Sequence, residues 1–312
     1  MITTMPLFSY PTTVALIDDD QLFLKSMTRI LGQNHLMKTF SDSREALNYF
    51  ENYKSILTSV PFLRACSDYE SYDEIGHMPV DINSSKLMEL RNRSERNQDI
   101  SVIVVDYNMP KINGLELCRQ LRGLPFKKIL LTGAVEHSEA VAAFNEGLID
   151  RFVRKDNQNL IEEIENHLIE LQKQNTIDST RGLLSHLETD RPLSISDTLF
   201  CTFFKNWCIK NNIREHYLMD KQGNFIVVDD KNETFYFIIH TNKTLSEFVD
   251  LHEDDEGVSG LIDAVSKRKL VPFFGIGIEA WQKKESEWSE HFYVPQLFEG
   301  KEKYYWTVIK GN

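Results

Sequence analysis

Polar residues suited to phosphate chemistry follow several short apolar segments of this sequence. Asp18 and Asp19 follow TVALI, Asp106 follows SVIVV, Thr132 follows KKILL, and Lys155 follows RFVR. Carboxylates that converge repel one another, and a hard divalent cation such as Mg²⁺ relieves that repulsion. A carboxylate can also attack a phosphoryl group and become an acyl phosphate. A hydroxyl group and an amine, as on Thr132 and Lys155, can then stabilise the developing charge.

The apolar segments alternate with amphipathic segments, as strands alternate with helices in an α/β protein. We predict strands at 13–17, 36–40, 101–106, 127–131 and 149–154. We predict one helix that ends near Gly32 and a second that ends near Tyr53. We predict three more helices at 114–122, 137–147 and 157–174. This order indicates a doubly wound, five-stranded parallel sheet with helices on both faces. In such sheets the ligands bind at the carboxyl edge, where all five polar positions fall.

Residues 13–175 resemble the receiver domain of two-component response regulators, which has a flavodoxin-like fold. The resemblance rests on the acidic pair, on IVVDYNMP followed by Gly114, on Thr132 and on Lys155. It implies that Asp106 accepts a phosphoryl group from a sensor histidine kinase. It further implies that Thr132 and Lys155 engage that phosphoryl group, so that the domain catalyses only its own phosphorylation and dephosphorylation.

The same resemblance assigns the metal site and the switch. Asp18, Asp19, Asp106 and the backbone carbonyl of Asn108 would bind Mg²⁺, and Asp20 corresponds to a third acid that is common in the family. Thr132 and the aromatic Phe152 would change conformation together after phosphorylation. Asp156 departs from the family, because a proline with a cis bond usually follows the lysine. Since a non-proline cis bond costs about 3 kcal/mol, we expect a trans or a strained bond here.

The connection between the second helix and the third strand is far longer than the usual few residues. It runs from about 54 to 100 and holds an apolar piece, an acidic piece (SDYESYDEIG) and a predicted helix from Ser84 to Arg96. One interpretation is an elaborated crossover that packs over its own sheet. The other is a docking surface for an output domain or a partner.

The composition changes near residue 196, beyond which all four tryptophans lie. We therefore predict a receiver domain at 10–175, a linker at 176–195 and an α+β output domain at 196–312. The output domain would contain an antiparallel sheet with strands at 216–220, 225–229, 234–240, 271–276, 292–298 and 303–309, and a helix with Trp281 and Trp288 would precede the last two. Its order is loosely similar to PAS-like folds. The layout is also similar to the quorum-sensing regulators of the Lqs system.

The net charge of −12 argues against a nucleic-acid partner, which a basic surface would attract. The triplet Lys267-Arg268-Lys269 is the only short basic run, and we interpret it as a helix C-terminus. The favoured output is therefore a binding or dimerisation module, and a nucleic-acid-binding transcriptional regulator is the alternative. An enzymatic output is third, because we find no GGDEF, EAL or HD signature, no P-loop and no zinc spacing.

The sequence also bears on the cellular compartment. The four cysteines are scattered without a CxxC pair, which is typical of reduced thiols. No apolar run reaches the roughly 18 to 20 residues that cross a bilayer, and the N-terminus does not read as a signal peptide. We therefore expect a cytoplasmic protein without a membrane partner.

Overall fold

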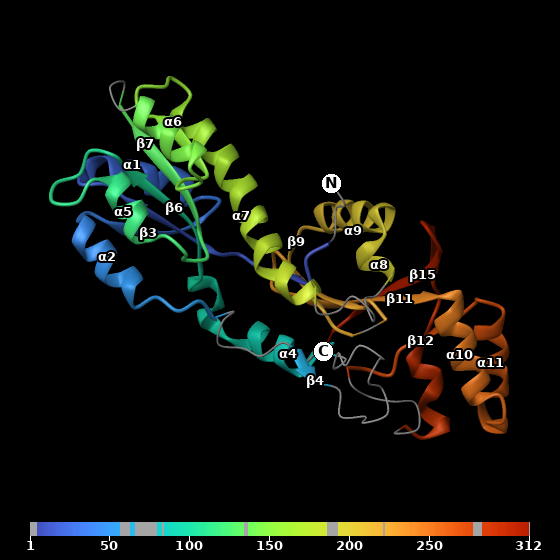
Figure 1. Cartoon of the computed structure of the whole chain (residues 1–312). Helices are drawn as coiled ribbons and strands as arrows, with labels where there is room; N and C mark the ends of the chain where they lie inside the picture. Colours follow the sequence, from blue (N-terminus) through green and yellow to red (C-terminus); the bar gives the residue numbers. More distant parts are fainter. Residues whose placement is uncertain are drawn as a thin grey trace, which may run out of the picture. The chain divides into compact units, whose positions relative to one another are not determined.

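The chain folds into two compact units, each assembled from separate stretches of sequence (Figure 1). The computed structural model describes residues 5–56, 63–65, 80–82, 84–133, 137–185, 193–220, 222–276 and 283–311. Tyr10–Pro61 and Met88–Leu183 form one unit, called here the parallel-sheet unit. Met1–Ser9, Phe62–Leu87 and Leu184–Asn312 form the other, the antiparallel-sheet unit.

Five parallel strands form the centre of the parallel-sheet unit, in the order β3-β2-β6-β7-β8. The strands are β2 (Thr13–Ile17), β3 (Leu36–Phe40), β6 (Ile100–Asp106), β7 (Lys127–Thr132) and β8 (Arg151–Arg154). Every residue of β2 and β6 is buried, as expected for inner strands that are covered on both faces. The predicted doubly wound five-stranded sheet is therefore confirmed.

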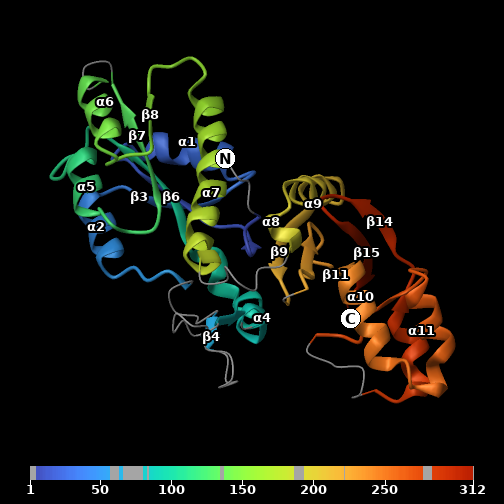
Figure 2. The same cartoon turned by 45° about the vertical axis from the view of Figure 1, so that its right-hand side comes forward.

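Helices cover both faces of this sheet (Figure 2). They are α1 (Gln21–Leu31), α2 (Ser43–Glu51), α5 (Gly114–Gln120), α6 (His137–Asn145) and α7 (Leu160–Ser185). Apolar residues of α1 and α7 pack on one face, and those of α2, α5 and α6 pack on the other. The two cores hold the strands in place, so the carboxyl ends of β2, β6, β7 and β8 meet at one edge.

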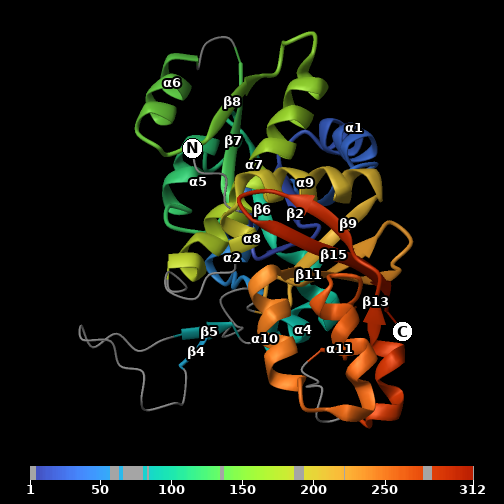
Figure 3. The ribbon, with the colours of Figure 1, turned by 90° about the vertical axis from the view of Figure 1, so that its right-hand side faces the viewer.

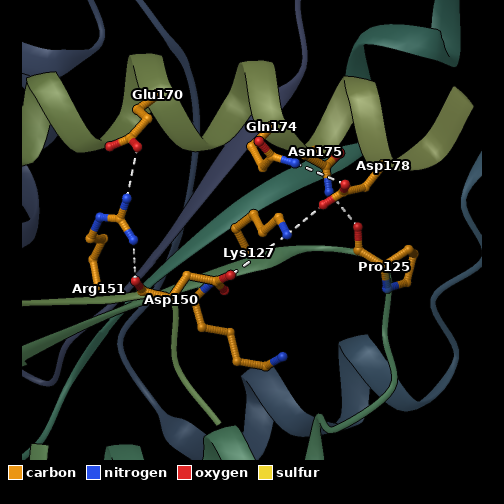
Figure 4. A network of polar contacts seen from close by, with 9 residues as sticks. Pro125, Lys127, Asp150, Arg151, Glu170, Gln174, Asn175 and Asp178 are labelled. Carbon is orange, nitrogen blue, oxygen red and sulfur yellow. Dashed lines mark hydrogen bonds and ion pairs between the residues drawn. The ribbon is translucent and has the colours of Figure 1, made fainter. Parts of the chain in front are cut away.

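The last of these helices is longer than the predicted 157–174. α7 continues to Ser185, through residues that we expected to begin a linker. A polar network fixes its second half to the start of β7, where the Lys127 amine lies 2.7 Å from Asp178 and 3.6 Å from Asp150 (Figure 4). These contacts offset the low helix propensity of the polar residues near 175–180, which is why local pattern alone placed the end too early.

The long insertion is described only in part. It contains a short hairpin of β4 (Leu63–Ala65) and β5 (Val80–Ile82), then α4 (Ser84–Asn92) and a 3-10 helix (Ser94–Gln98). The predicted single helix from Ser84 to Arg96 is thus two shorter ones, and most of the apolar and acidic pieces lie outside the described residues. Phe62–Leu87 groups with the antiparallel-sheet unit, not with the sheet of its own sequence neighbours.

The second unit is built on a six-stranded antiparallel sheet, of which Figure 3 labels β9, β11 and β15. The strand order is β1 (Phe8–Ser9), β9 (Ile213–Leu218), β10 (Phe225–Asp229), β11 (Thr234–Thr241), β15 (Lys303–Lys310) and β14 (Gln296–Glu299). The predicted antiparallel sheet is confirmed, but β1 was not predicted. Only 271–272 of the predicted strand 271–276 is a strand, β12 (Val271–Pro272), which pairs with β13 (Phe292–Tyr293).

The helices of this unit pack around the sheet. They are α8 (Leu193–Ser196), α9 (Thr198–Lys210), α10 (Asn242–His252) and α11 (Ser259–Ser266), with 3-10 helices at Glu256–Val258 and Glu285–His291. The rings of Phe200, Phe204 and Trp207 on α9 all contact Phe237 of β11. Phe200 and Phe204 are therefore core residues, and Trp207 packs against the same ring while half-buried. Trp288 lies in a 3-10 helix, not in the predicted α-helix, and Trp281 lies outside the described residues.

The basic triplet is largely occupied by local contacts. The Arg268 guanidinium donates hydrogen bonds to Asn242 and to the Ser246 hydroxyl, and the Lys267 amine pairs with Asp263 at 2.7 Å. These contacts stabilise the end of α11, which agrees with its interpretation as a helix C-terminus.

Two partly buried histidines of the antiparallel sheet should make its stability sensitive to acid. Burial lowers the pKa of His216 and of His240 to about 4. His240 donates from Nε2 to the Pro272 carbonyl at 3.0 Å, which requires only the neutral ring. An unfolded histidine titrates near pH 6.5, so between about pH 6.5 and 4 the unfolded chain takes up protons that the folded chain does not.

We therefore expect the free energy of unfolding of this unit to fall as the pH drops through that range. The fall should be at most about 1.4 kcal/mol per pH unit for each histidine. Urea titrations at several pH values, followed by tryptophan fluorescence, would measure it, since all four tryptophans lie beyond residue 196. The double variant His216→Gln, His240→Gln should have a flatter pH profile, and an unchanged slope would contradict the assignment.

Candidate functional site

Strand β2 delivers a buried carboxylate to the sheet edge. Asp18 follows the strand and is 0% exposed, while Asp19 is exposed. Asp20 caps α1, because its carboxylate accepts hydrogen bonds from the backbone N–H groups of Leu22 and Phe23. A helix that begins directly after the strand thus fixes the turn that carries the acidic pair. Asp20 itself is used as a helix cap.

Strand β6 places the second buried carboxylate beside the first. Asp106 ends this inner strand and is 5% exposed. Gly114 lies where the chain turns back, since a Cβ at that position would be 2.1 Å from the Asp106 carbonyl oxygen. The glycine after NMP is therefore required by the close approach of α5 to the end of β6.

Lys155 connects the two buried carboxylates. Its Nζ lies 2.6 Å from Asp18 Oδ2 and 2.8 Å from Asp106 Oδ1. The same amine lies 4.8 Å from the centre of the Phe23 ring, a cation–π contact that the sequence reading did not include. The backbone N–H of Lys155 donates to the Thr132 carbonyl at 2.9 Å, which holds the ends of β8 and β7 together.

Thr132 brings an unused hydroxyl to the same edge. Thr132 is 0% exposed, and its Oγ1 has no hydrogen-bond partner among the residues that the structure describes. A buried hydroxyl without a partner is unfavourable by about 1–3 kcal/mol, so such a group calls for an explanation. An acceptor that arrives from outside, such as a phosphoryl oxygen, would satisfy it.

The charges of the site influence one another strongly. Burial raises the pKa of Asp106, and the nearby Asp18 and Asp19 raise it further, whereas Lys155 lowers it without cancelling the effect. Burial alone would lower the pKa of Lys155, but its hydrogen bonds to Asp106 and Asp18 outweigh burial and raise it. The amine is therefore held in its charged form between the two carboxylates.

The residue after the lysine forms a local ion pair. The Lys155–Asp156 peptide bond is trans, as one of the two predicted alternatives required. The Asp156 carboxylate accepts two hydrogen bonds from the Arg154 guanidinium, at 3.0 and 2.6 Å. Asp156 is thus paired with Arg154.

The two remaining predicted residues lie close to the site in sequence. Asn108 follows Asp106 by two residues and is exposed. Phe152, on β8, is half-buried; its ring meets that of Phe144 edge-on, with centroids 6.3 Å apart. Phe152 also borders a hollow of about 450 Å³ that Arg154, Asp156, Asn157 and Glu163 line.

The donor set fits a hard divalent cation. One ligand atom from each of Asp18, Asp19 and Asp106 lies within 4.8 Å of the others. Such oxygen donors suit Mg²⁺, which usually binds through a few protein oxygens and keeps several waters. Among the described residues this is the one such group of acidic, histidine or cysteine side chains.

The comparisons with known proteins concern the class of domain and the fold. The profile described as "Response regulator receiver domain" matches residues 81–165. The chain thus carries the receiver domain of a two-component response regulator.

One solved structure that is similar to the chain over its whole length is the Legionella pneumophila response regulator LqsR. It has a TM-score of 0.77 at 25% identity and covers 100% of this chain and 91% of that one. This match supports the Lqs-type resemblance. The match to an adenylate cyclase from Rhodopirellula baltica has a TM-score of 0.38 at 21% identity and covers 56% of this chain and 98% of that one. The match to a response regulator receiver domain protein from Clostridium thermocellum has a TM-score of 0.34 at 19% identity and covers 55% of this chain and 98% of that one. No curated protein matches the sequence significantly.

Proposed function

We propose that the chain is a phosphorelay response regulator that accepts a phosphoryl group on Asp106 from a sensor histidine kinase. The observation that carries this proposal is the convergence at one sheet edge of two buried carboxylates, a bridging amine and a buried hydroxyl that has no partner in the described part of the chain. A structural ion pair alone would account for the first three groups. It would leave the Thr132 hydroxyl unexplained.

The residues would act in the following roles. An oxygen of the Asp106 carboxylate attacks the phosphorus of a phosphohistidine; a P–O bond forms while the P–N bond breaks, and its electron pair leaves on the imidazole nitrogen. Mg²⁺, held by Asp18, Asp19, Asp106 and the Asn108 carbonyl, would neutralise charge on the phosphoryl oxygens. Lys155 exchanges its ion pair with Asp106 for one with the phosphoryl group.

Thr132 donates its hydroxyl to a phosphoryl oxygen, which satisfies a group that is otherwise unpaired. The movement of Thr132 would let Phe152 turn inward, so that these two residues act as the switch. This role for Phe152 comes from the family resemblance. If Phe152 turned inward, Phe144 would lose its edge-on contact with the Phe152 ring.

We propose that the receiver domain spans residues 10–175, with the insertion at 54–100, and that 176–195 connects it to the output domain at 196–312. The output would be a binding or dimerisation module, PAS-like in type, in a cytoplasmic quorum-sensing regulator. Among the described residues, no helix is both long enough and apolar enough to cross a membrane. The occupied basic triplet gives no support to the alternative of a nucleic-acid-binding output. A salt-dependent shift of nucleic acid by the full chain would favour that alternative.

Labelling of Asp106 tests the proposal. Full-length protein treated with acetyl phosphate and Mg²⁺ should gain the mass of one phosphoryl group, and chelation of the metal should prevent the gain. Asp106→Asn should abolish it because the amide is not a nucleophile toward phosphorus. Asp42→Asn, which changes a partly exposed carboxylate outside the site, should label normally. Equal labelling of Asp106→Asn would show that the acceptor is another residue.

A further inference from the structure

The N-terminal residues of the chain are part of the antiparallel sheet. Phe8 pairs with Tyr217, and Ser9 pairs with His216 of β9. The N–H of Leu218 donates to the Leu7 carbonyl at 2.6 Å. Leu7 and Phe8 are 2% and 1% exposed. This segment is therefore a core component of the antiparallel-sheet unit.

The residues that follow at once belong to the other unit. The Tyr10 hydroxyl donates to Asp99 Oδ2 at 3.1 Å, and the Thr12 hydroxyl donates to Ser101 Oγ at 2.6 Å. The division between the units falls between Ser9 and Tyr10. The chain therefore passes from one unit to the other between two adjacent residues.

Asp99 also accepts hydrogen bonds from the segment that precedes the second division between the units. The side chain is buried, at 5% exposed, and it accepts hydrogen bonds from the Tyr53 hydroxyl, the Ser55 hydroxyl and the Ile56 N–H at 3.2, 3.2 and 2.8 Å. Residues 53–56 lead to the next division, between Pro61 and Phe62. One buried carboxylate thus fixes two of the segments through which the chain leaves the parallel-sheet unit.

We propose that Asp99 and the segment Ser9–Thr13 mechanically couple the phosphorylation site to the antiparallel sheet. β2 begins at Thr13 and ends next to Asp18. A short stretch of chain, held by hydrogen bonds, therefore has the edge strand β1 at one end and the acidic site at the other. A shift of β2 on phosphorylation would be transmitted to the β1–β9 pairing. This inference rests on the proposed function, because it takes phosphorylation of Asp106 as its input.

Amide hydrogen exchange of β9 in the full chain tests the coupling. With acetyl phosphate and Mg²⁺, we expect the exchange rates of Ile213–Leu218 to change by about threefold or more, the size of effect that a modest shift in local opening produces. Three glycines inserted between Ser9 and Tyr10 should remove this change while intact mass still reports labelling of Asp106. The same insertion between Asp230 and Lys231, in the β10–β11 turn, should preserve it.

Asp99→Asn provides a second variant of nearly unchanged shape, should the insertion prevent folding. It removes the charge and one acceptor oxygen, and we expect it to reduce the change at β9 to less than about twofold. The coupling would be overturned if phosphorylated wild-type protein showed unchanged exchange rates at β9. It would also be overturned if the change in exchange rates persisted in both variants. Failure of the wild-type chain to label at all would instead refute the proposed function.

Discussion

Replacing Lys155 with methionine should lower the free energy of unfolding of the parallel-sheet unit by about 2 to 4 kcal/mol when no divalent cation is present. The amine is the group that neutralises Asp18 and Asp106, both nearly inaccessible to solvent. Methionine fills a similar volume but leaves two buried carboxylates facing each other beside a third. The loss should therefore exceed that of an ordinary ion pair.

Urea titration followed by circular dichroism would measure this loss, while tryptophan fluorescence reports separately on the antiparallel-sheet unit. Lys111→Met is the matched control, because Lys111 pairs with Asp42 at an exposed position and should contribute less than about 1 kcal/mol. Mg²⁺ should restore more stability to Lys155→Met than to the wild-type protein, since a cation would replace the missing charge. Equal losses in the two lysine variants would contradict a special role for Lys155.

Phe8→Ala should destabilise the antiparallel-sheet unit by about 3 to 5 kcal/mol, the usual loss for a phenylalanine in a packed core. The side chain is 1% exposed and pairs across the sheet with Tyr217, which is itself 0% exposed. The truncation would leave a cavity between an edge strand and the rest of the sheet. If β1 contributed little to this core, Phe8→Ala would lower the free energy of unfolding far less. The size of the loss therefore measures how fully β1 belongs to the core.

The urea midpoint of the tryptophan signal would report this loss. Ser9→Ala is the control, since it keeps the strand and its backbone pairing but removes only a hydroxyl. A loss below about 1 kcal/mol in Phe8→Ala would mean that β1 is only loosely attached.

The parallel sheet and its site could be read from the sequence because their signals are local. Four of the five strands are short apolar runs whose last residue, or the next one, belongs to the site, as in IVVD with Asp106. The right-handed crossover rule then brings these ends to one edge without further information. Once the strand ends lie at one edge, Lys155 can be expected to contact both Asp18 and Asp106. Its contact with Phe23 cannot be expected in the same way, because it depends on how the first turn of α1 meets β8.

The missed features depend on residues far apart in the chain. β1 is two residues long and pairs with β9 about two hundred positions later, so no periodicity could identify it. The extension of α7 depends on the ion pair between Asp178 and Lys127 and on the Asn175 amide, which donates to the Pro125 carbonyl. Local propensity cannot report such preferences.

The interleaving of the two units affects how the molecule could be divided. A cut near residue 190 looks natural from sequence, yet it would separate β1 from β9. The N-terminal piece would carry Leu7 and Phe8 without their cover, and the C-terminal piece would present a bare strand edge. Unpaired edges template pairing with other chains, so each half alone should tend to aggregate or to exchange strands. Mixed together, the halves should instead reassociate by restoring the β1–β9 pair.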